Sequence, residues 1–263
     1  MKQYALTDII SAYEQKKEWE KQFPVSYYIF RKLSFPITYL VLKLTTSPSK
    51  VAITGFFIGI AGNISLLYAD STGILPGIIL LMIVALSDAV DGNIARTTKN
   101  VTYYGKYLDS VLGISIEGTY PLFLGIGLYL WEECQCVTNP FGLFDSDLKL
   151  MMLICGAIIT AGAVYSNKIT ETYDYQRIHK EKDSNQFKHD INAKFGTSTY
   201  SRNPFYLLFS NLNAFNLQLP VLLICYFVSA VDIFMLFFAG YYLFRYIFIL
   251  LFYTYRASTR LNT

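Results

Sequence analysis

The stretch SDAVDGNIARTTKNVTYYGKYLDSVLG, residues 87–113, places three aspartates and an arginine where one strongly apolar segment ends and the next begins. Ionisable side chains at or within the hydrocarbon of a membrane cost several kcal/mol each unless they face a cavity, a partner or an ion. These acidic residues are therefore candidates for a functional site, and the apolar segments around them set the fold.

The whole chain has the composition of an integral membrane protein. Of its 263 residues, 53% are hydrophobic and 16% are charged, and the mean hydropathy is +0.34, outside the usual range for soluble domains. A hydrocarbon core of roughly 30 Å needs about 20 mostly apolar residues per spanning helix. We therefore expect an all-α polytopic membrane protein with six transmembrane helices, at 51–68, 73–95, 104–131, 148–165, 212–229 and 233–255.

The segment ahead of the first span is expected to lie on the membrane surface. Residues 27–44 mix apolar side chains with three basic ones, a pattern that favours an N-terminal amphipathic interfacial helix over a span. Residues 1–24 are polar and charged and lack the continuous apolar core of a cleavable signal. The predicted organisation is a cytoplasmic N-terminal segment at 1–50 and a six-helix transmembrane domain at 51–263.

Lysine and arginine residues predict the orientation in the membrane. They gather before the first span, between the second and third spans, and between the fourth and fifth, whereas the opposite loops have none before Lys149. The positive-inside rule then places both termini and the aspartate-rich stretch in the cytoplasm, and we expect a prokaryotic cell membrane. Because the net charge is only +3, the basic residues indicate orientation and anionic membrane lipids as partners, and no nucleic acid.

The loops leave two questions open. Cys134 and Cys136 lie in an outer loop, where a disulfide is a minority interpretation because a pair separated by one residue is strained when bridged. The long hydrophilic connection at 166–203 is either functional or disordered.

The three aspartates form a candidate metal site. Asp88 and Asp91 are three residues apart and share a helix face, and Asp109 enters the next helix at the same end. Three converging carboxylates repel one another unless a cation lies between them. Oxygen ligands select a hard metal such as magnesium, manganese or calcium. A solvated helix cap or a salt bridge to Arg96 is the usual role of a single aspartate, but the combination favours a metal.

The residues between the aspartates fit a large anionic ligand. Gly92 and Gly105 remove side-chain bulk on either side of the cluster, so that such a ligand could approach the backbone. Arg96 follows Gly92 by one turn, at the end of the helix where its guanidinium could meet a phosphate.

DAVDGNIAR followed by GKYLD resembles the signature of the CDP-alcohol phosphotransferases, membrane enzymes that make phospholipid headgroup linkages. Their pattern is D-x-x-D-G-x-x-A-R, about eight residues, then G-x-x-x-D-x-x-x-D. The stretch SPSKVAITG, residues 47–55, is also similar to the entry of that family's first span. The first seven motif positions are occupied by Asp88, Asp91, Gly92, Ala95, Arg96, Gly105 and Asp109.

The resemblance implies a reaction and its cofactor. A phosphoalcohol group, in particular a phosphatidyl group from CDP-diacylglycerol, would pass to an acceptor hydroxyl with release of CMP in phospholipid biosynthesis. Mg²⁺ or Mn²⁺ would be held by Asp88, Asp91 and Asp109. The family also makes a homodimer plausible.

The resemblance implies a nucleotide pocket, and the sequence of the long connection offers residues for the acceptor. The acceptor would meet basic residues of the long connection, although these could equally be positive-inside residues only. The basic residues offered to the acceptor are Lys168, Arg177 and Arg202. The nucleotide would be bound by Gly92, Ala95, Arg96 and Gly105.

One motif position differs from the family pattern. Gly113 stands where the family has its fourth aspartate, which completes the two-metal site and is usually proposed as the base. Either Glu117, one turn further on, replaces it, or another group acts, or the chemistry is lost. Because Glu117 and Arg245 lie at comparable depth, we predict that they form an ion pair in the bundle interior. The functional alternative makes Glu117, together with Asp109, a catalytic residue.

Two other classes of protein remain open. A transporter could also place carboxylates at a membrane interface, although the chain has no half-chain repeat of the kind that many transporters show. A catalytically silent homologue that binds a nucleotide or lipid is the third interpretation, and Gly113 is its only support.

Overall fold

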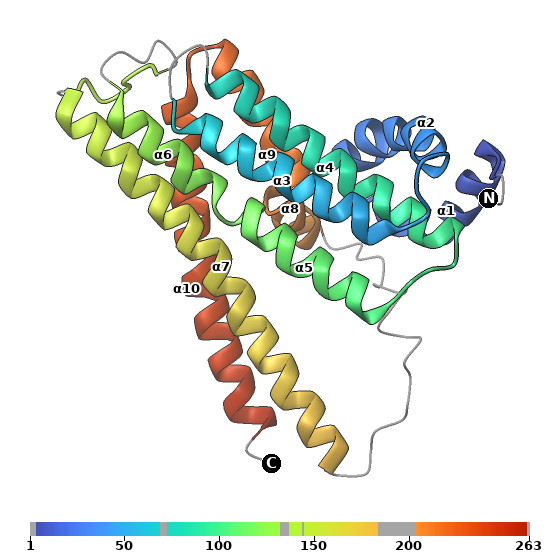
Figure 1. Ribbon diagram of the computed structural model, residues 1–263. Coiled ribbons are helices and arrows are strands. Elements are labelled where there is room, and N and C mark those ends of the chain that lie inside the picture. Colours follow the sequence, from blue (N-terminus) through green and yellow to red (C-terminus); the bar gives the residue numbers. More distant parts are fainter. Residues whose placement is uncertain (1–3, 69–72, 132–136, 144, 184–203, 262–263) are drawn as a thin grey trace.

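The computed structural model describes residues 4–68, 73–131, 137–143, 145–183 and 204–261, and these residues form helices joined by turns (Figure 1). The expected all-α, polytopic membrane fold is confirmed. In chain order the elements are α1 (Leu6–Glu20), the π-helical turn η1 (Ser26–Phe30), α2 (Arg31–Leu42), α3 (Pro48–Leu66), α4 (Ile74–Thr97), α5 (Tyr103–Glu117), α6 (Tyr120–Leu130), α7 (Asp145–Asp183), α8 (Pro204–Leu212), α9 (Phe215–Phe227) and α10 (Val231–Arg260).

Five segments of the described chain are long and apolar enough to cross a membrane. They are Pro48–Leu66, Ile74–Thr97, Tyr103–Leu130, Asp145–Lys180 and Val231–Arg260. The span expected at 212–229 forms the 13-residue helix α9 instead. At 1.5 Å per residue this helix is about 20 Å long, less than the hydrocarbon thickness. Six full-length spans are therefore not confirmed.

The third span is interrupted near its middle. Helix α5 ends at Glu117 and α6 begins at Tyr120, with Pro121 in the first turn of α6. The break is held from a neighbouring helix, because the Asn63 amide of α3 donates to the Thr119 hydroxyl at 3.0 Å. As a result Glu117 lies at a helix end within the bundle.

Helix α7 extends much further than the sequence predicted. The predicted connection at 166–203 is helical as far as Asp183, because α10 runs beside it over this length (Figure 1). The rings of Tyr173 and Tyr253 are 5.1 Å apart, and the Lys180 ammonium donates to the backbone carbonyl of Arg260 at 2.7 Å. Packing between the two helices thus offsets the polar character of the second half of α7.

The core lies between α3, α4, α6, α7, α9 and α10. Its fully buried side chains include Leu66, Ile78, Leu124, Met152 and Leu219. Large apolar side chains also cover the outside of the bundle, which is the surface that lipid would contact.

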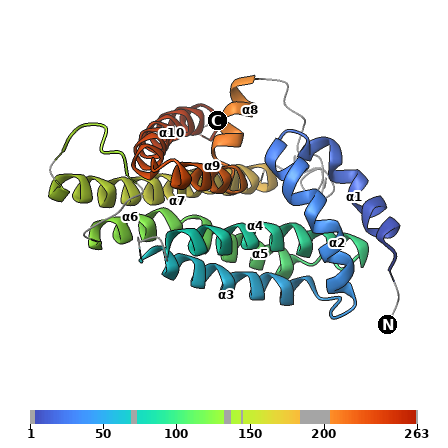
Figure 2. The same ribbon diagram turned by 90° about the horizontal axis from the view of Figure 1, so that it is seen from above.

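The N-terminal arm, which we define as residues 6–42 of α1, η1 and α2, packs against α4 (Figure 2). The helix expected at 27–44 is present as η1 and α2. Its inner face is polar, because Arg31, Ser34 and Thr38 are buried there. The arm is therefore joined to the membrane domain by buried polar side chains, as well as by the apolar contacts of Ile9 and Leu42 with α4.

Candidate active site

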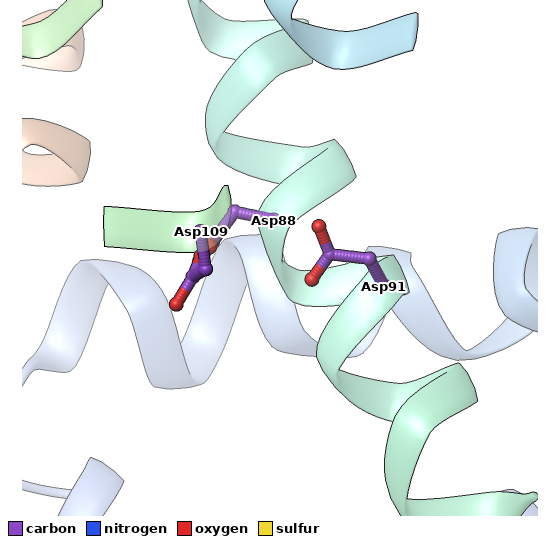
Figure 3. A group of neighbouring side chains, drawn as sticks. All are labelled: Asp88, Asp91 and Asp109. Carbon is purple, nitrogen blue, oxygen red and sulfur yellow. The ribbon is translucent and has the colours of Figure 1, made fainter. Parts of the chain in front are cut away.

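The three motif aspartates come together at the facing sides of α4 and α5. Figure 3 shows Asp88 and Asp91 on α4 and Asp109 on α5, with their carboxylates gathered between the two helices. One oxygen from each carboxylate lies within 4.8 Å of the others. Within the described part of the chain, none of the three forms an ion pair with a basic side chain. The carboxylate cluster, as we call these three residues, is a group of like charges without a counter-charge in contact.

A cavity of about 270 Å³ extends from the carboxylate cluster into the bundle. Its walls come from the N-terminal arm, from α3, α4 and α5, and from the turn between α8 and α9. On α5 the lining includes Asp109, Gly113 and Glu117, which are spaced by one turn each. One face of a single helix therefore joins the carboxylate cluster to Glu117.

Gly113 leaves open space where the family motif has an aspartate. A Cβ atom built on Gly113 would meet no atom within 4 Å. Glu117 follows about 6 Å further along the helix axis, at 1.5 Å per residue, and has solvent-accessible surface. The cavity thus contains an acidic side chain beyond the carboxylate cluster on α5 itself, separated from Asp109 by the open space at Gly113.

The predicted ion pair between Glu117 and Arg245 is wrong. The Arg245 guanidinium instead donates to the Asn167 side chain of α7 at 3.1 Å and lies over the Tyr242 ring, 5.7 Å from its centroid. Arg245 belongs to the contact between α7 and α10, whereas Glu117 faces the cavity. Comparable depth in the membrane therefore did not bring the two charges together.

The predicted nucleotide-binding residues lie at the cluster end of α4 and α5, outside the lining of the cavity. Arg96 donates to the Asn93 side chain at 3.0 Å, and a Cβ on Gly92 would lie 3.2 Å from the Arg96 guanidinium. The buried Nε of Arg96 has no hydrogen-bond partner among the described residues. Ala95 is in the last turn of α4, and Gly105 donates its backbone N–H to the Thr102 cap of α5 at 2.9 Å.

The predicted acceptor-binding residues are not brought to the cavity in the described part of the chain. Lys168 and Arg177 lie on α7, away from the cavity lining, and Arg177 forms an ion pair with Asp174 at 3.2 Å. Arg202 falls outside the described residues, as does the predicted disulfide candidate, Cys134 with Cys136. The acceptor role of these basic residues stays a prediction.

A buried ion pair that the sequence did not reveal fixes the N-terminal arm to α4. Glu20 and Arg31 are each only 3% exposed. Two guanidinium nitrogens of Arg31 donate to the Glu20 carboxylate at 2.5 and 2.7 Å. A third donates to the Ala89 carbonyl at 3.0 Å and to the Asn93 side chain at 2.8 Å. Burial alone would raise the pKa of Glu20, but the hydrogen bond and charge of Arg31 outweigh it, so the pKa is lowered.

Asn93 connects this ion pair to the motif arginine. Its amide oxygen accepts from both Arg31 and Arg96, and its amide nitrogen donates to the hydroxyls of Ser34 and Thr38 at 2.9 and 3.2 Å. We call this set the arm network, with members Glu20, Arg31, Ser34, Thr38, Asn93 and Arg96. Its signal in the sequence is the spacing of Arg31, Ser34 and Thr38, a polar stripe on an otherwise apolar helix.

Lys16 is the second feature that the sequence did not single out. It lines the cavity from α1 together with Trp19 and Glu20, which lie on the same helix face. Its ammonium lies over the Trp19 ring, 5.1 Å from the centroid. Burial, and then the positive charge of Arg96, lower the pKa of Lys16.

The fold and the site define a polytopic membrane protein with a carboxylate cluster beside an internal cavity. The model of the CDP-alcohol phosphatidyltransferase family matches residues 45–184, more than half of the chain, so the protein belongs to this family. Its members are membrane transferases that use a CDP-alcohol and an alcohol acceptor in phospholipid synthesis, typically with a divalent metal. None of the curated proteins compared with the chain matches it.

Proposed function

We propose that this protein transfers a phosphatidyl group from CDP-diacylglycerol, or a phosphoalcohol group from another CDP-alcohol, to an acceptor hydroxyl and releases CMP. The proposal rests on the carboxylate cluster, whose oxygens lie within 4.8 Å of one another, and on the membership of the chain in this family. We place the site and both termini on the cytoplasmic side, from the positive-inside rule.

The donor atoms of the carboxylate cluster fit a hard divalent cation. All three are carboxylate oxygens, and no basic side chain of the described residues pairs with them. Asp88, Asp91 and Asp109 would hold Mg²⁺ or Mn²⁺. When bound, such an ion neutralises charge on the diphosphate and aligns the attacking and leaving oxygens.

In this proposal Glu117 is the general base. The acceptor hydroxyl would lie in the open space at Gly113, between Asp109 and Glu117, and the Glu117 carboxylate would take its proton directly or through one water. The hydroxyl oxygen forms a bond to the β-phosphorus of the CDP-alcohol. The bond from that phosphorus to the bridging oxygen breaks, and its electron pair leaves with CMP.

Arg96 would bind the phosphate of the departing CMP. Its guanidinium is held by Asn93 through one nitrogen, while the Nε donor has no partner among the described residues. Gly92 leaves room for the Arg96 side chain and for the nucleotide beside it. Ala95 and Gly105 would complete the nucleotide pocket.

Release of CMP tests the proposal. Purified protein in liposomes should release CMP from CDP-diacylglycerol in the presence of Mn²⁺ and a panel of soluble alcohols. Glu117→Gln should lower kcat by a factor of about 10² to 10⁴, the usual contribution of a general base. The matched control is Glu171→Gln, an exposed glutamate of α7 away from the cavity, which should retain wild-type kcat.

A second substitution tests the position of the base. Gly113→Asp in the Glu117→Gln background restores the carboxylate of the family motif at a place with open space, so it should recover part of the lost kcat. Full activity of Glu117→Gln alone would contradict the assigned base. Binding of CDP-diacylglycerol without CMP release would favour a silent homologue, and absence of any binding would favour a transporter.

A further inference from the structure

Lys16 is brought into the cavity by the way that α1 is anchored. Glu20 follows Lys16 by four residues, on the same helix face, and its carboxylate is fixed by Arg31. Trp19 lies between them and supports the Lys16 side chain. The ammonium is therefore directed to the cavity by two fixed neighbours, although its own helix lies outside the membrane-spanning segments.

The Lys16 ammonium forms no ion pair within the described chain, and Glu20 and Asp88 attract it only from beyond contact distance. Both oxygens of the Glu20 carboxylate accept from Arg31, at 2.5 and 2.7 Å, and one also accepts from the Ser26 hydroxyl at 3.3 Å. The aspartates of the carboxylate cluster line the same cavity, but none of them forms an ion pair with Lys16. A half-buried ammonium with no anion in contact is costly, and a substrate anion in contact with it would lower that cost.

We propose that Lys16 binds a phosphate oxygen of a substrate in the cavity, so that the N-terminal arm supplies part of the substrate site. This inference rests on the proposed function and deepens it. Two substrates could present such an oxygen: the diphosphate of the CDP-alcohol, or the phosphate of a phosphorylated acceptor. Both substrates would present a phosphate oxygen to Lys16. Measuring the binding of each ligand alone distinguishes them.

Ligand binding to purified protein in detergent tests the role of Lys16. The probes are inorganic phosphate, which represents a phosphorylated acceptor, and CDP-diacylglycerol with Mn²⁺, which represents the donor. Lys16→Met removes the charge but keeps the aliphatic stem on Trp19. We expect the Kd of one or both probes to rise by about tenfold to a hundredfold, the usual loss for a hydrogen bond to a charged group.

The adjacent lysine provides a matched control. Lys17 pairs with Glu14 on the outer face of α1, at 2.9 Å, so Lys17→Met should leave both Kd values unchanged. Lys16→Arg keeps the positive charge but changes the shape of the side chain, and it should retain most of the affinity. This variant therefore distinguishes the effect of the charge from that of side-chain packing. If Lys16→Met does not fold, Lys16→Gln replaces it in the same measurements.

The outcome assigns the source of the phosphate. A loss confined to inorganic phosphate assigns Lys16 to the acceptor, and a loss confined to CDP-diacylglycerol assigns it to the donor. Equal Kd values for wild type and Lys16→Met with both probes, or no binding of either probe to wild type, would overturn the inference. Binding needs no turnover, so a protein that binds through Lys16 but releases no CMP would refute the proposed function and leave the inference standing.

Discussion

The arm network and the carboxylate cluster both include residues of α4, and they balance their charges in opposite ways. In the arm network the buried acid Glu20 is bound by Arg31, and the amide oxygen of Asn93 accepts from Arg31 and Arg96. In the carboxylate cluster three acids meet without a base in contact. The charge of Glu20 is neutralised by the protein itself, whereas the charges of the carboxylate cluster are neutralised only by something that binds. Charge balance thus separates the structural Glu20–Arg31 pair from the functional carboxylate cluster.

The largest expected effect comes from breaking the arm network. Arg31→Met leaves the Glu20 carboxylate buried without a cation, so the free energy of unfolding should fall by about 3–5 kcal/mol. Unfolding of the purified protein in mixed detergent micelles, together with proteolysis of the N-terminal arm, measures the loss.

The double variant Glu20→Met with Arg31→Met is the control for this prediction. Removing both charges of a buried pair is often neutral, so the double variant should recover most of the lost stability. An Arg31→Met variant as stable as wild type would show that the arm does not depend on the ion pair.

Neutralising a charge in the carboxylate cluster should not lower the free energy of unfolding, in contrast to Arg31→Met. Without a divalent cation, Asp91→Asn removes repulsion and should be at least as stable as wild type. With Mn²⁺ at a hundredfold excess over its Kd, wild type should gain about 2.7 kcal/mol and Asp91→Asn should gain nothing. Thermal unfolding with and without Mn²⁺ measures both effects.

The matched control for this second prediction is Asp174→Asn, at a half-exposed aspartate of α7 that pairs with Arg177. This variant should keep the Mn²⁺ effect of the wild type. A metal-dependent gain that survives in Asp91→Asn would exclude the carboxylate cluster as the binding site.

The smallest effect concerns the open space beside the carboxylate cluster. Gly113→Ala adds a methyl group that meets no atom within 4 Å, so it should stabilise helix α5 by about 0.5–1 kcal/mol. Gly59→Ala is the contrasting change, because its Cβ would lie 2.8 Å from the Ile116 side chain, and it should destabilise the protein. Thermal unfolding of both variants measures the difference in their stability. A destabilising Gly113→Ala would show that the space at this position is filled in the folded protein.

Local patterns predicted the membrane class and the residues of the carboxylate cluster. Hydropathy marked the long apolar helices, since each must cross the same thickness of hydrocarbon. The spacing of Asp88 and Asp91 placed both on one helix face, and the short connection brought Asp109 to the same end. The same patterns missed the break after Glu117 and the extension of α7, because both depend on a neighbouring helix.

The sequence by itself determined that this chain spans a membrane and carries a motif able to gather three carboxylates, because hydropathy and helical periodicity are local properties. Only the tertiary structure decided which charges are paired. Arg31 meets Asn93 across 62 positions of the chain, and Glu117 faces a cavity instead of Arg245. Such contacts follow from how whole helices pack, and depth in the membrane does not specify which face of a helix meets which neighbour.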